Sequence, residues 1–270
     1  RSPVRCSGLR TDAGTSAIET EEGEVITADL VLLAAGVAPD WFAQLGIRVL
    51  ERPTPNTALV FNASFPGQQS GRAFERFTEN GPLAVLPLQT LSHADQRYNV
   101  VWSVSNSTAT TFGDLDDEAF RNHFQDAFGW RLGRVQAVGR RSQWPLMRLS
   151  ASEQFRAGFL LVGNAAHTLH PVAGQGLNLS LREAGLLAQA IADAQQRSAA
   201  IGCCASLKTY LDQVSDEQRL VVDSTDALAI LFNRRGPLLD VPRDASLALL
   251  DLLPAIRQQV ASVGTGRRYA

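Results

Sequence analysis

Alternating apolar and polar residues in the first half of the chain predict a structure rich in β-strands. Residues 1–40 have the pattern of strands, with a polar hairpin-like segment that ends in a buried strand over residues 30–34. Further strands are expected over residues 55–66 and around residues 98–105, where apolar side chains recur at every second position. The side chains expected on the buried faces of these two strands are Leu59, Phe61, Val100, Trp102 and Val104.

The second half of the chain changes to helical spacing. Acidic residues at Asp114–Glu118 precede an apolar pattern and favour a helix start there over a catalytic cluster. A short apolar strand over Phe159–Val162 is followed by a helix, and two more helical segments are expected over residues 207–232 and 245–263. The apolar residues at helical spacing after the short strand are Leu177, Leu181, Ala184, Leu187, Ala188 and Ile191.

Composition excludes several classes of protein. The chain has 270 residues, 45% of them hydrophobic, which is enough for one large core or two modest ones. A net charge of -2 argues against a nucleic-acid partner. The three cysteines cannot form a disulfide framework, and Cys203 and Cys204 are adjacent, so a reducing, cytoplasmic compartment is expected. The chain opens without Met, and we interpret it as the C-terminal part of a longer protein.

The strongest chemical signal is the turn between the short strand and the helix that follows it. The stretch from Gly163 to Gly176 is rich in glycine, alanine and proline and lies just before the helix start. Glycine lets a ligand approach the backbone, and unpaired N–H groups at a helix start attract an anionic or electron-rich group. Tight packing is an equal alternative for a Gly-x-Gly motif alone.

The longer string decides between these two interpretations. Residues 163–178, "GNAAHTLHPVAGQGLN", closely resemble the second flavin-binding motif of class A flavoprotein monooxygenases. Asn164 stands where most of these enzymes have Asp, which is typical of the ubiquinone-biosynthesis hydroxylase branch. Residues 72–88, the strand "VVWSV" and residues 223–233 are also similar to that branch. The resemblance covers roughly residue 25 to the end.

The resemblance implies a set of cofactor-binding residues. Asn164 would contact the ribityl chain of FAD, while Pro171 and Gly174–Asn178 would lie along its isoalloxazine ring. No side chain is assigned a catalytic role, because the cofactor carries the chemistry. The complete cofactor-binding set is Gly163, Asn164, His167, Pro171, Gly174, Gln175, Gly176, Leu177 and Asn178.

The resemblance also implies a fold of the α/β (α+β) class. A partial Rossmann-like FAD-binding domain would carry an inserted antiparallel-sheet substrate domain and C-terminal helices. The expected division places the FAD-binding domain at residues 1–50 and 146–200. The substrate domain would take residues 51–145, and a C-terminal helical region residues 201–270.

The implied activity is hydroxylation of the aromatic ring of a polyprenylated phenol in ubiquinone biosynthesis. The enzyme would use FAD, NAD(P)H and O₂ through a flavin C4a-hydroperoxide. Such a substrate is membrane-soluble, so contact at the periphery of the inner membrane or with other enzymes of the pathway is expected. Packing of the C-terminal amphipathic segments onto the core is favoured over membrane contact.

Two departures from the family pattern keep a second function open. A Gly-x-Gly-x-x-Gly turn is absent from the sequence, and it would hold the adenosine diphosphate half of the cofactor. The family's Ala-Asp-Gly-x-x-Ser motif is replaced at residues 34–39, where Ala35 and Pro39 take the places of Asp and Ser. This change predicts poorer use of a pyridine nucleotide. The alternative is a flavin-free or weakly flavin-binding paralogue that acts as an assembly partner.

Other chemistries are less well supported by the sequence. His167 and His170 are three residues apart, but no Cys, Asp or Glu accompanies them at metal-ligand spacing. A Gly-x-Ser-x-Gly elbow is absent, which argues against a hydrolase. Trp102 and Trp144 are expected in the core, and His93 and His123 as ordinary surface or partly buried residues.

Overall fold

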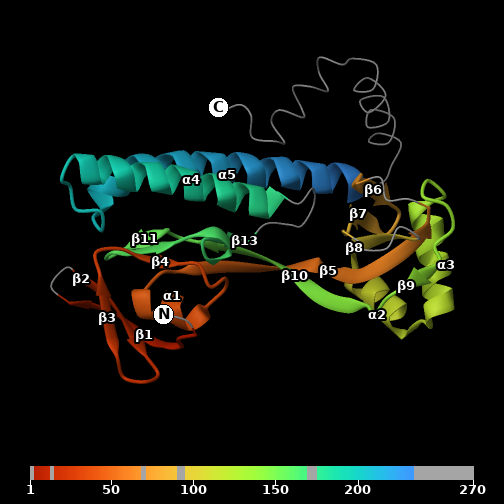
Figure 1. The fold of residues 1–270 in the computed structure, drawn as a ribbon, viewed down its shortest axis with the longest axis horizontal. Coiled ribbons are helices and arrows are strands. Elements are labelled where there is room, and N and C mark those ends of the chain that lie inside the picture. The colour runs from red at the N-terminus through yellow and green to blue at the C-terminus, as the bar shows by residue number, and fades with distance from the viewer. Residues whose placement is uncertain (1–2, 13–14, 68–70, 90–94, 169–174, 234–270) are drawn as a thin grey trace, which may run out of the picture.

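The computed structural model describes residues 3–12, 15–67, 71–89, 95–168 and 175–233 (Figure 1). Two groups of strands lie at opposite ends of the molecule, and the long strands β5 (Val49–Pro66) and β10 (Ser142–Ala151) run between them. The helices α4 (Gln175–Gln196) and α5 (Cys204–Asn233) form a hairpin over one of these ends. The fold is therefore of the mixed α/β class that the sequence predicts.

The larger sheet is antiparallel, with the order β13-β10-β5-β8-β7-β6, and β9 pairs with β5. Its buried face confirms the alternation predicted from the sequence, because Leu59 and Phe61 are at most 2% exposed and Trp102 is fully buried. The remaining strands of this sheet are β6 (Phe74–Thr78), β7 (Gly81–Pro87), β8 (Asp95–Ser105), β9 (Ala137–Val138) and β13 (His167–Thr168).

Two helices cover the buried face of this sheet. α2 (Asn106–Asp114) starts where the Ser105 side chain accepts a hydrogen bond from the Thr108 N–H. α3 (Asp117–Phe128) starts where Asp116 accepts one from the Ala119 N–H at 2.7 Å. The acidic cluster is thus a helix start, as predicted, since acidic side chains cap free N–H groups there. Together with the sheet these helices enclose an aromatic core built on Phe61, Phe65, Tyr98, Trp102, Phe112, Phe120, Phe124 and Phe128.

Segments far apart in the sequence meet in a second sheet. β4 (Val31–Leu33) pairs in parallel with β12 (Phe159–Leu161), and β11 (Phe155–Arg156) pairs antiparallel with β12. One face of this sheet packs on α4 and α5 through Leu160, Leu187 and Tyr210. The larger antiparallel sheet is therefore inserted between two pieces of another layered unit, which agrees with the predicted fold class.

The other face of this second sheet meets the N-terminal strands and a short helix. A third sheet contains β1 (Cys6–Asp12), β2 (Thr15–Thr20) and β3 (Val25–Ala28). α1 (Pro39–Leu45) was not expected from the sequence, and it buries Phe42 against Val31 and Leu161. Pro39 is at the start of α1, where its missing N–H would have no partner within the helix anyway.

Several predictions need correction or lie outside the described residues. Trp144 is 63% exposed on β10 and does not belong to the core, because both faces of this part of the ribbon are open. The expected domain boundaries at residues 50/51 and 145/146 fall inside β5 and β10, and the pairing of β10 with β5 shifts register between Pro145 and Met147. The helix expected over residues 245–263 and His93 lie outside the described residues, whereas His123 is exposed as expected. Among the described residues, none of the helices is long and apolar enough to cross a membrane.

Candidate flavin site

The first part of the glycine-rich stretch, residues 163–168, is a compact turn after β12. The chain leaves β12 at Leu161, forms the short helix η1 (Gly163–Ala165), and continues into β13. Gly163 has a φ of 58°, in the left-handed region that glycine adopts most readily. The Ala166 N–H donates to the Gly163 carbonyl at 2.9 Å, which closes the turn. The sequence folds this way locally because small residues let the backbone reverse against α4.

A cavity of about 770 Å³ lies beside this turn and runs along α4. Its size is in the range of small-molecule sites, and its wall is mainly apolar with a few polar groups. Gly163 and Asn164 contribute the turn, whereas Gly176 and Leu177 contribute the first turn of α4. The full lining is Leu32, Ala34, Gly36, Val162, Gly163, Asn164, Thr168, Gly176, Leu177, Ser180, Ala184, Leu187, Ala188 and Ile191.

The end of β4 reaches the same cavity. Because β4 and β12 are parallel neighbours, with Leu33 opposite Leu161, their carboxyl ends meet at one edge of the sheet. Ala34 and Gly36 therefore line the cavity together with Gly163. The start of the altered motif at residues 34–39 therefore lies beside the turn that resembles a flavin-binding motif, although Ala34 and Asn164 are 130 residues apart in sequence.

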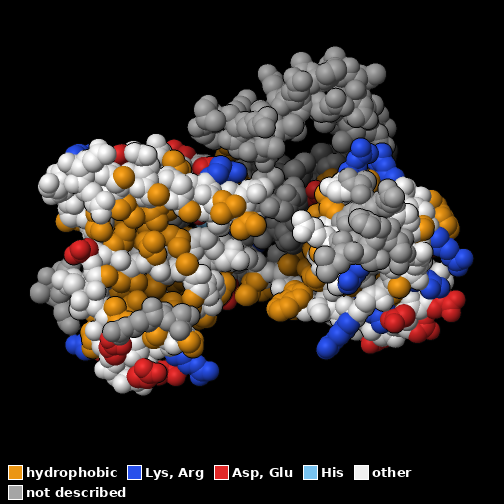
Figure 2. Space-filling view, viewed as in Figure 1, with side chains coloured by type: hydrophobic (Ala, Val, Ile, Leu, Met, Phe, Trp, Pro, Cys, Tyr) orange, Lys and Arg blue, Asp and Glu red, His pale blue; other side chains and the backbone are white. Residues whose placement is uncertain are grey.

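The apolar residues of α4 that recur at helical spacing differ in burial. Leu177 and Leu181 are 69% and 63% exposed, whereas Leu187 is buried. The helix also buries Leu179 and Glu183, which are not part of this stripe. Figure 2 shows hydrophobic side chains gathered over this helical layer and over the strands below it. Leu177, Ala184, Leu187, Ala188 and Ile191 of the stripe line the cavity, whereas Leu181 lies outside its lining.

The predicted cofactor-binding residues fall into three groups. Gly163, Asn164, Gly176 and Leu177 line the cavity, and Asn178 is exposed on the same turn of α4. The ring of His167 is buried and faces α4. Pro171 and Gly174 lie outside the described residues, as does the side chain of Gln175, the first residue of α4.

His167 takes part in a buried polar network that the sequence did not suggest. Its Nε2 lies 2.8 Å from Oε1 of Glu183, and the two residues are 5% and 2% exposed. Gln218 on α5 donates to the same carboxylate oxygen at 2.8 Å, and Gln154 donates to Gln218. Glu183 is 16 positions after His167, so this contact lies outside the short sequence spacing that was considered for a metal site.

The charge of Glu183 also affects a neighbouring phenol. Burial, and secondly the negative charge of Glu183, raise the pKa of Tyr210 above its usual value of 10.0. Tyr210 is 2% exposed in the cluster between α5 and β12. Tyr210 therefore lies buried near the carboxylate of Glu183.

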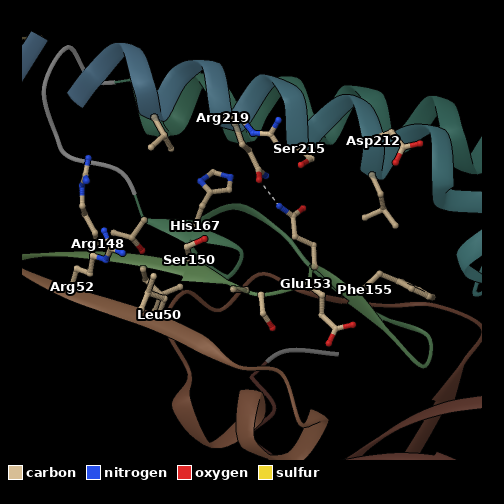
Figure 3. A pocket seen from close by; sticks show the side chains of 18 of the residues that line it. Leu50, Arg52, Arg148, Ser150, Glu153, Phe155, His167, Asp212, Ser215 and Arg219 are labelled. Atoms are coloured by element: carbon tan, nitrogen blue, oxygen red, sulfur yellow. Dashed lines mark hydrogen bonds between the residues drawn. The ribbon is translucent and has the colours of Figure 1, made fainter. Parts of the chain in front are cut away.

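A second cavity, of about 730 Å³, opens on the other side of His167 (Figure 3). In Figure 3, His167 lies between Ser150 and the helical layer, with Arg52 and Arg148 on the neighbouring strands below. Arg52 and Arg148 are direct cross-strand partners on β5 and β10. Thr168, at the end of the turn, lines both cavities.

The residues around the first cavity fit the ring and ribityl half of FAD. Helix starts in general carry N–H groups without a partner in the helix and partial positive charge, which suit an electron-rich ring edge. Gly176 has open space where a Cβ would stand, so a flat ligand can reach the backbone. Asn164 presents an exposed amide at the mouth of the turn. Among the described residues, His, Cys, Asp and Glu nowhere gather in a group of three suited to a metal ion.

Comparison with protein families agrees with this site. The family described as "FAD binding domain" matches residues 10–225, which include the turn and most of α5. Ubiquinone hydroxylase UbiL of Rhodospirillum rubrum is 31% identical over 231 residues, which cover 86% of this chain and 53% of that protein. The 3-demethoxyubiquinol 3-hydroxylase of Escherichia coli is 26% identical over 249 residues, with 92% and 62% covered.

Solved structures share the fold. The p-nitrophenol 4-monooxygenase PnpA of Pseudomonas putida superposes with a TM-score of 0.71 at 15% identity, covering 97% of this chain and 66% of that one. This identity supports the fold alone. The chain spans about half to three fifths of the length of the curated relatives it matches, with 59%, 53% and 62% covered for the first three.

Proposed function

Since this chain belongs to the FAD-binding-domain family, we propose that it forms the flavin-ring and substrate-facing part of an FAD-dependent aromatic hydroxylase. The observation that carries the proposal is the shared cavity at the carboxyl ends of β4 and β12 and the start of α4. In open α/β sheets, ligands bind at this kind of edge.

Each part of the site has a distinct role in this proposal. Asn164 hydrogen-bonds the ribityl hydroxyls, and Gly163 lets the turn reverse close to the cofactor. Gly176 and Leu177 bring the start of α4 to the ring, and Asn178 lies beside them. From the resemblance to the family motif, Pro171, Gly174 and Gln175 would also contact the flavin. When bound, FAD supplies the redox and oxygen-transfer chemistry, and the chain orients the cofactor and excludes water.

The substrate class follows from the relatives and from the surface. Two relatives are named as hydroxylases, of ubiquinone and of 3-demethoxyubiquinol, and the apolar cavity wall at Leu177 and Leu187 suits a hydrophobic ligand. We propose a polyprenylated phenol as substrate, with NAD(P)H and O₂ as co-substrates. A cytoplasmic protein at the periphery of the inner membrane would meet such a substrate.

The division into domains belongs to the same proposal. Residues 1–50 and 146–200 would carry the cofactor, residues 51–145 would face the substrate, and residues 201–270 would form a helical region. Because β5 and β10 are continuous across both boundaries, the two units would share a rigid ribbon. Such a ribbon fixes how the substrate sheet faces the turn.

A second function has one specific observation in its favour. Ala34 and Gly36 line the cavity, and Ala35 between them has no side-chain acceptor for a ligand hydroxyl. A weakly flavin-binding assembly partner would show this change. The absorbance spectrum of a purified full-length protein that includes the diphosphate-binding part separates the two functions, since a bound-flavin band supports the hydroxylase and its absence supports the partner.

The test of the site is a titration of FAD into the isotope-labelled chain. We expect no saturation at low micromolar FAD, because the site for the diphosphate half of the cofactor is missing from this sequence. At higher concentrations, amide shifts should appear at Gly163, Asn164 and Gly176. Gly176→Leu should remove them, whereas Gly185→Leu should not, since Gly185 also has open space around it but lies outside the cavity lining.

The titration has outcomes that reject the site. Shifts confined to other parts of the chain would place the cofactor elsewhere. If the FAD-dependent shifts persist unchanged in Gly176→Leu, the start of α4 does not contact the cofactor. Tight binding at low micromolar concentration would mean that the chain anchors the cofactor through groups other than the missing diphosphate turn.

A further inference from the structure

Glu183 is a buried acid that the proposed chemistry does not use. We propose that it is a positioning residue, whose carboxylate fixes His167 as the Nε2–H tautomer. Through this contact it sets where α4 begins relative to the turn at Gly163 and Asn164. The functional consequence rests on the proposed flavin site, whereas the tautomer itself is a property of the chain alone.

The donor and acceptor inventory dictates the tautomer. An ionised carboxylate only accepts hydrogen bonds, so His167 must donate from Nε2 to Oε1 of Glu183. Gln218 donates its amide N–H to the same oxygen, so two donors converge on one acceptor. Nδ1 of His167 is buried without a hydrogen-bond partner among the described residues. The ring is therefore oriented from its Nε2 side.

The contact works together with a second one on the same helix face. Ser180 and Glu183 are three residues apart on α4, so their side chains lie on one face. Gly163 faces Ser180, and a Cβ built on Gly163 would lie 3.2 Å from its Oγ. His167 faces Glu183 at the other end of the turn. A shift of α4 by one residue would break both contacts, so together they set the helix in register with the turn.

The register determines the shape of the cofactor cavity. Asn164 lies between the two contact points of the turn, and Gly176 lies one helical turn before Ser180. Both residues line the cavity, on walls that belong to different elements. Their separation therefore depends on how the turn and α4 are held together.

A purely stabilising role does not account for this network. A buried carboxylate loses its hydration, and hydrogen bonds from neutral donors offset this cost in free energy only in part. An apolar contact between α4 and the turn would therefore stabilise the fold equally well. Polar groups in such places are best known for specifying one register. Arg182 and Glu217, next in sequence to Glu183 and Gln218, already form an ion pair between α4 and α5.

That neighbouring ion pair provides a matched control. Glu183→Gln and Glu217→Gln make the same change of charge on the same helical hairpin, but only Glu183 contacts His167. We would record long-range ¹H–¹⁵N spectra of the histidine rings in the full 270-residue chain, with His167→Gln to assign the signal. The original chain and Glu217→Gln should show His167 protonated at Nε2 with Nδ1 bare. Glu183→Gln should show exchange between tautomers, because an amide oxygen is a weaker acceptor.

A second readout reports on the register. Amide hydrogen exchange over residues 163–168 should rise about tenfold in Glu183→Gln and stay within about twofold in Glu217→Gln, since a charge-assisted hydrogen bond is lost in the first variant alone. An equal rise in both variants would mean general loosening of the hairpin and would overturn the positioning role.

The tautomer measurement separates this proposal from the flavin site. His167 protonated at Nδ1 in the original chain, or a single Nε2–H tautomer that persists in Glu183→Gln, would reject the role of Glu183 whatever the FAD titration shows. If His167 shows the expected tautomers but FAD causes no amide shifts, the role of Glu183 is supported and the flavin site is rejected. Because the original chain is itself decisive, failure of a variant to fold leaves the proposal testable.

Discussion

Gly163 and Ser180 lie so close that a Cβ on Gly163 would stand 3.2 Å from Oγ of Ser180. This contact presses the turn after β12 against α4 and depends on the left-handed backbone of Gly163. Two separate physical effects, backbone strain and crowding, thus make glycine the residue that fits here.

Substitution at this position should reveal both effects. Gly163→Ala should lower the free energy of unfolding by about 1–2 kcal/mol, since an L-residue in the left-handed region is strained. In a Ser180→Ala background the same substitution should cost less, because the crowding is relieved and the strain remains. Urea unfolding of the four chains measures the difference. Equal costs in both backgrounds would show that Ser180 does not limit the space.

Tyr210 should make stability depend on alkaline pH. Its pKa is raised in the folded chain by burial and then by Glu183, so the unfolded chain loses its phenolic proton first, near the usual value of 10.0. The folded state then binds more protons, and stability falls as pH rises above that value. Tyr210→Phe should flatten this fall, measured as unfolding free energy against pH. If the unfolding free energies of the original chain and Tyr210→Phe depend on pH in the same way, the pKa of Tyr210 is not raised by folding.

The same measurement tests the origin of the shift. Glu183→Gln should lower the pKa of Tyr210, because it removes the negative charge named as the second cause. Burial, the larger cause, would remain in this variant. The alkaline fall in stability should therefore begin at the same pH but level off at a lower pH, with a smaller total loss, and should not disappear.

Period-two alternation made the substrate-side sheet predictable from sequence. Leu59 and Trp102 sit on its buried face because one face of the sheet packs on helices and the other does not. β10 escaped prediction because Pro145 and a register shift between Pro145 and Met147 break its alternation. Trp144, in the same strand, was misplaced in the core for this reason.

The candidate site was predictable only in part. The motif at residues 163–178 indicated the turn and α4, and the parallel pairing of β4 and β12 later placed Ala34 and Gly36 beside it. Helical spacing could not tell that Leu177 faces a cavity, since periodicity reports a face and not what covers it. Glu183 gave no signal, because a buried acid and an exposed acid look alike in sequence.

Ala35 offers a test of the altered motif that rests on the proposed flavin site. Ala35→Asp adds an acceptor between the cavity-lining residues Ala34 and Gly36, and a charge-assisted hydrogen bond is worth about 1.5–3 kcal/mol. FAD should therefore bind roughly tenfold more tightly, measured by amide shifts during titration. Val37→Asp is the control, because Val37 is exposed nearby but, unlike Ala35, does not lie between two cavity-lining residues. If both variants change the affinity for FAD equally, the effect comes from the added negative charge and not from a specific hydrogen bond at Ala35.

Substitution by alanine should change stability in opposite directions at Gly202 and Gly185. Gly202, between α4 and α5, packs against the strand connection that precedes β4, where an added Cβ would lie 1.7 Å from the Asp29 carbonyl oxygen. That neighbour is backbone and cannot rotate away, so Gly202→Ala should cost about 2 kcal/mol or more. Gly185 is exposed inside α4 with open space around it, and Gly185→Ala should stabilise the chain by up to about 1 kcal/mol. Urea midpoints that move in opposite directions would support the packing of the helical hairpin on β4. A harmless Gly202→Ala would mean that the hairpin does not approach Asp29 in solution.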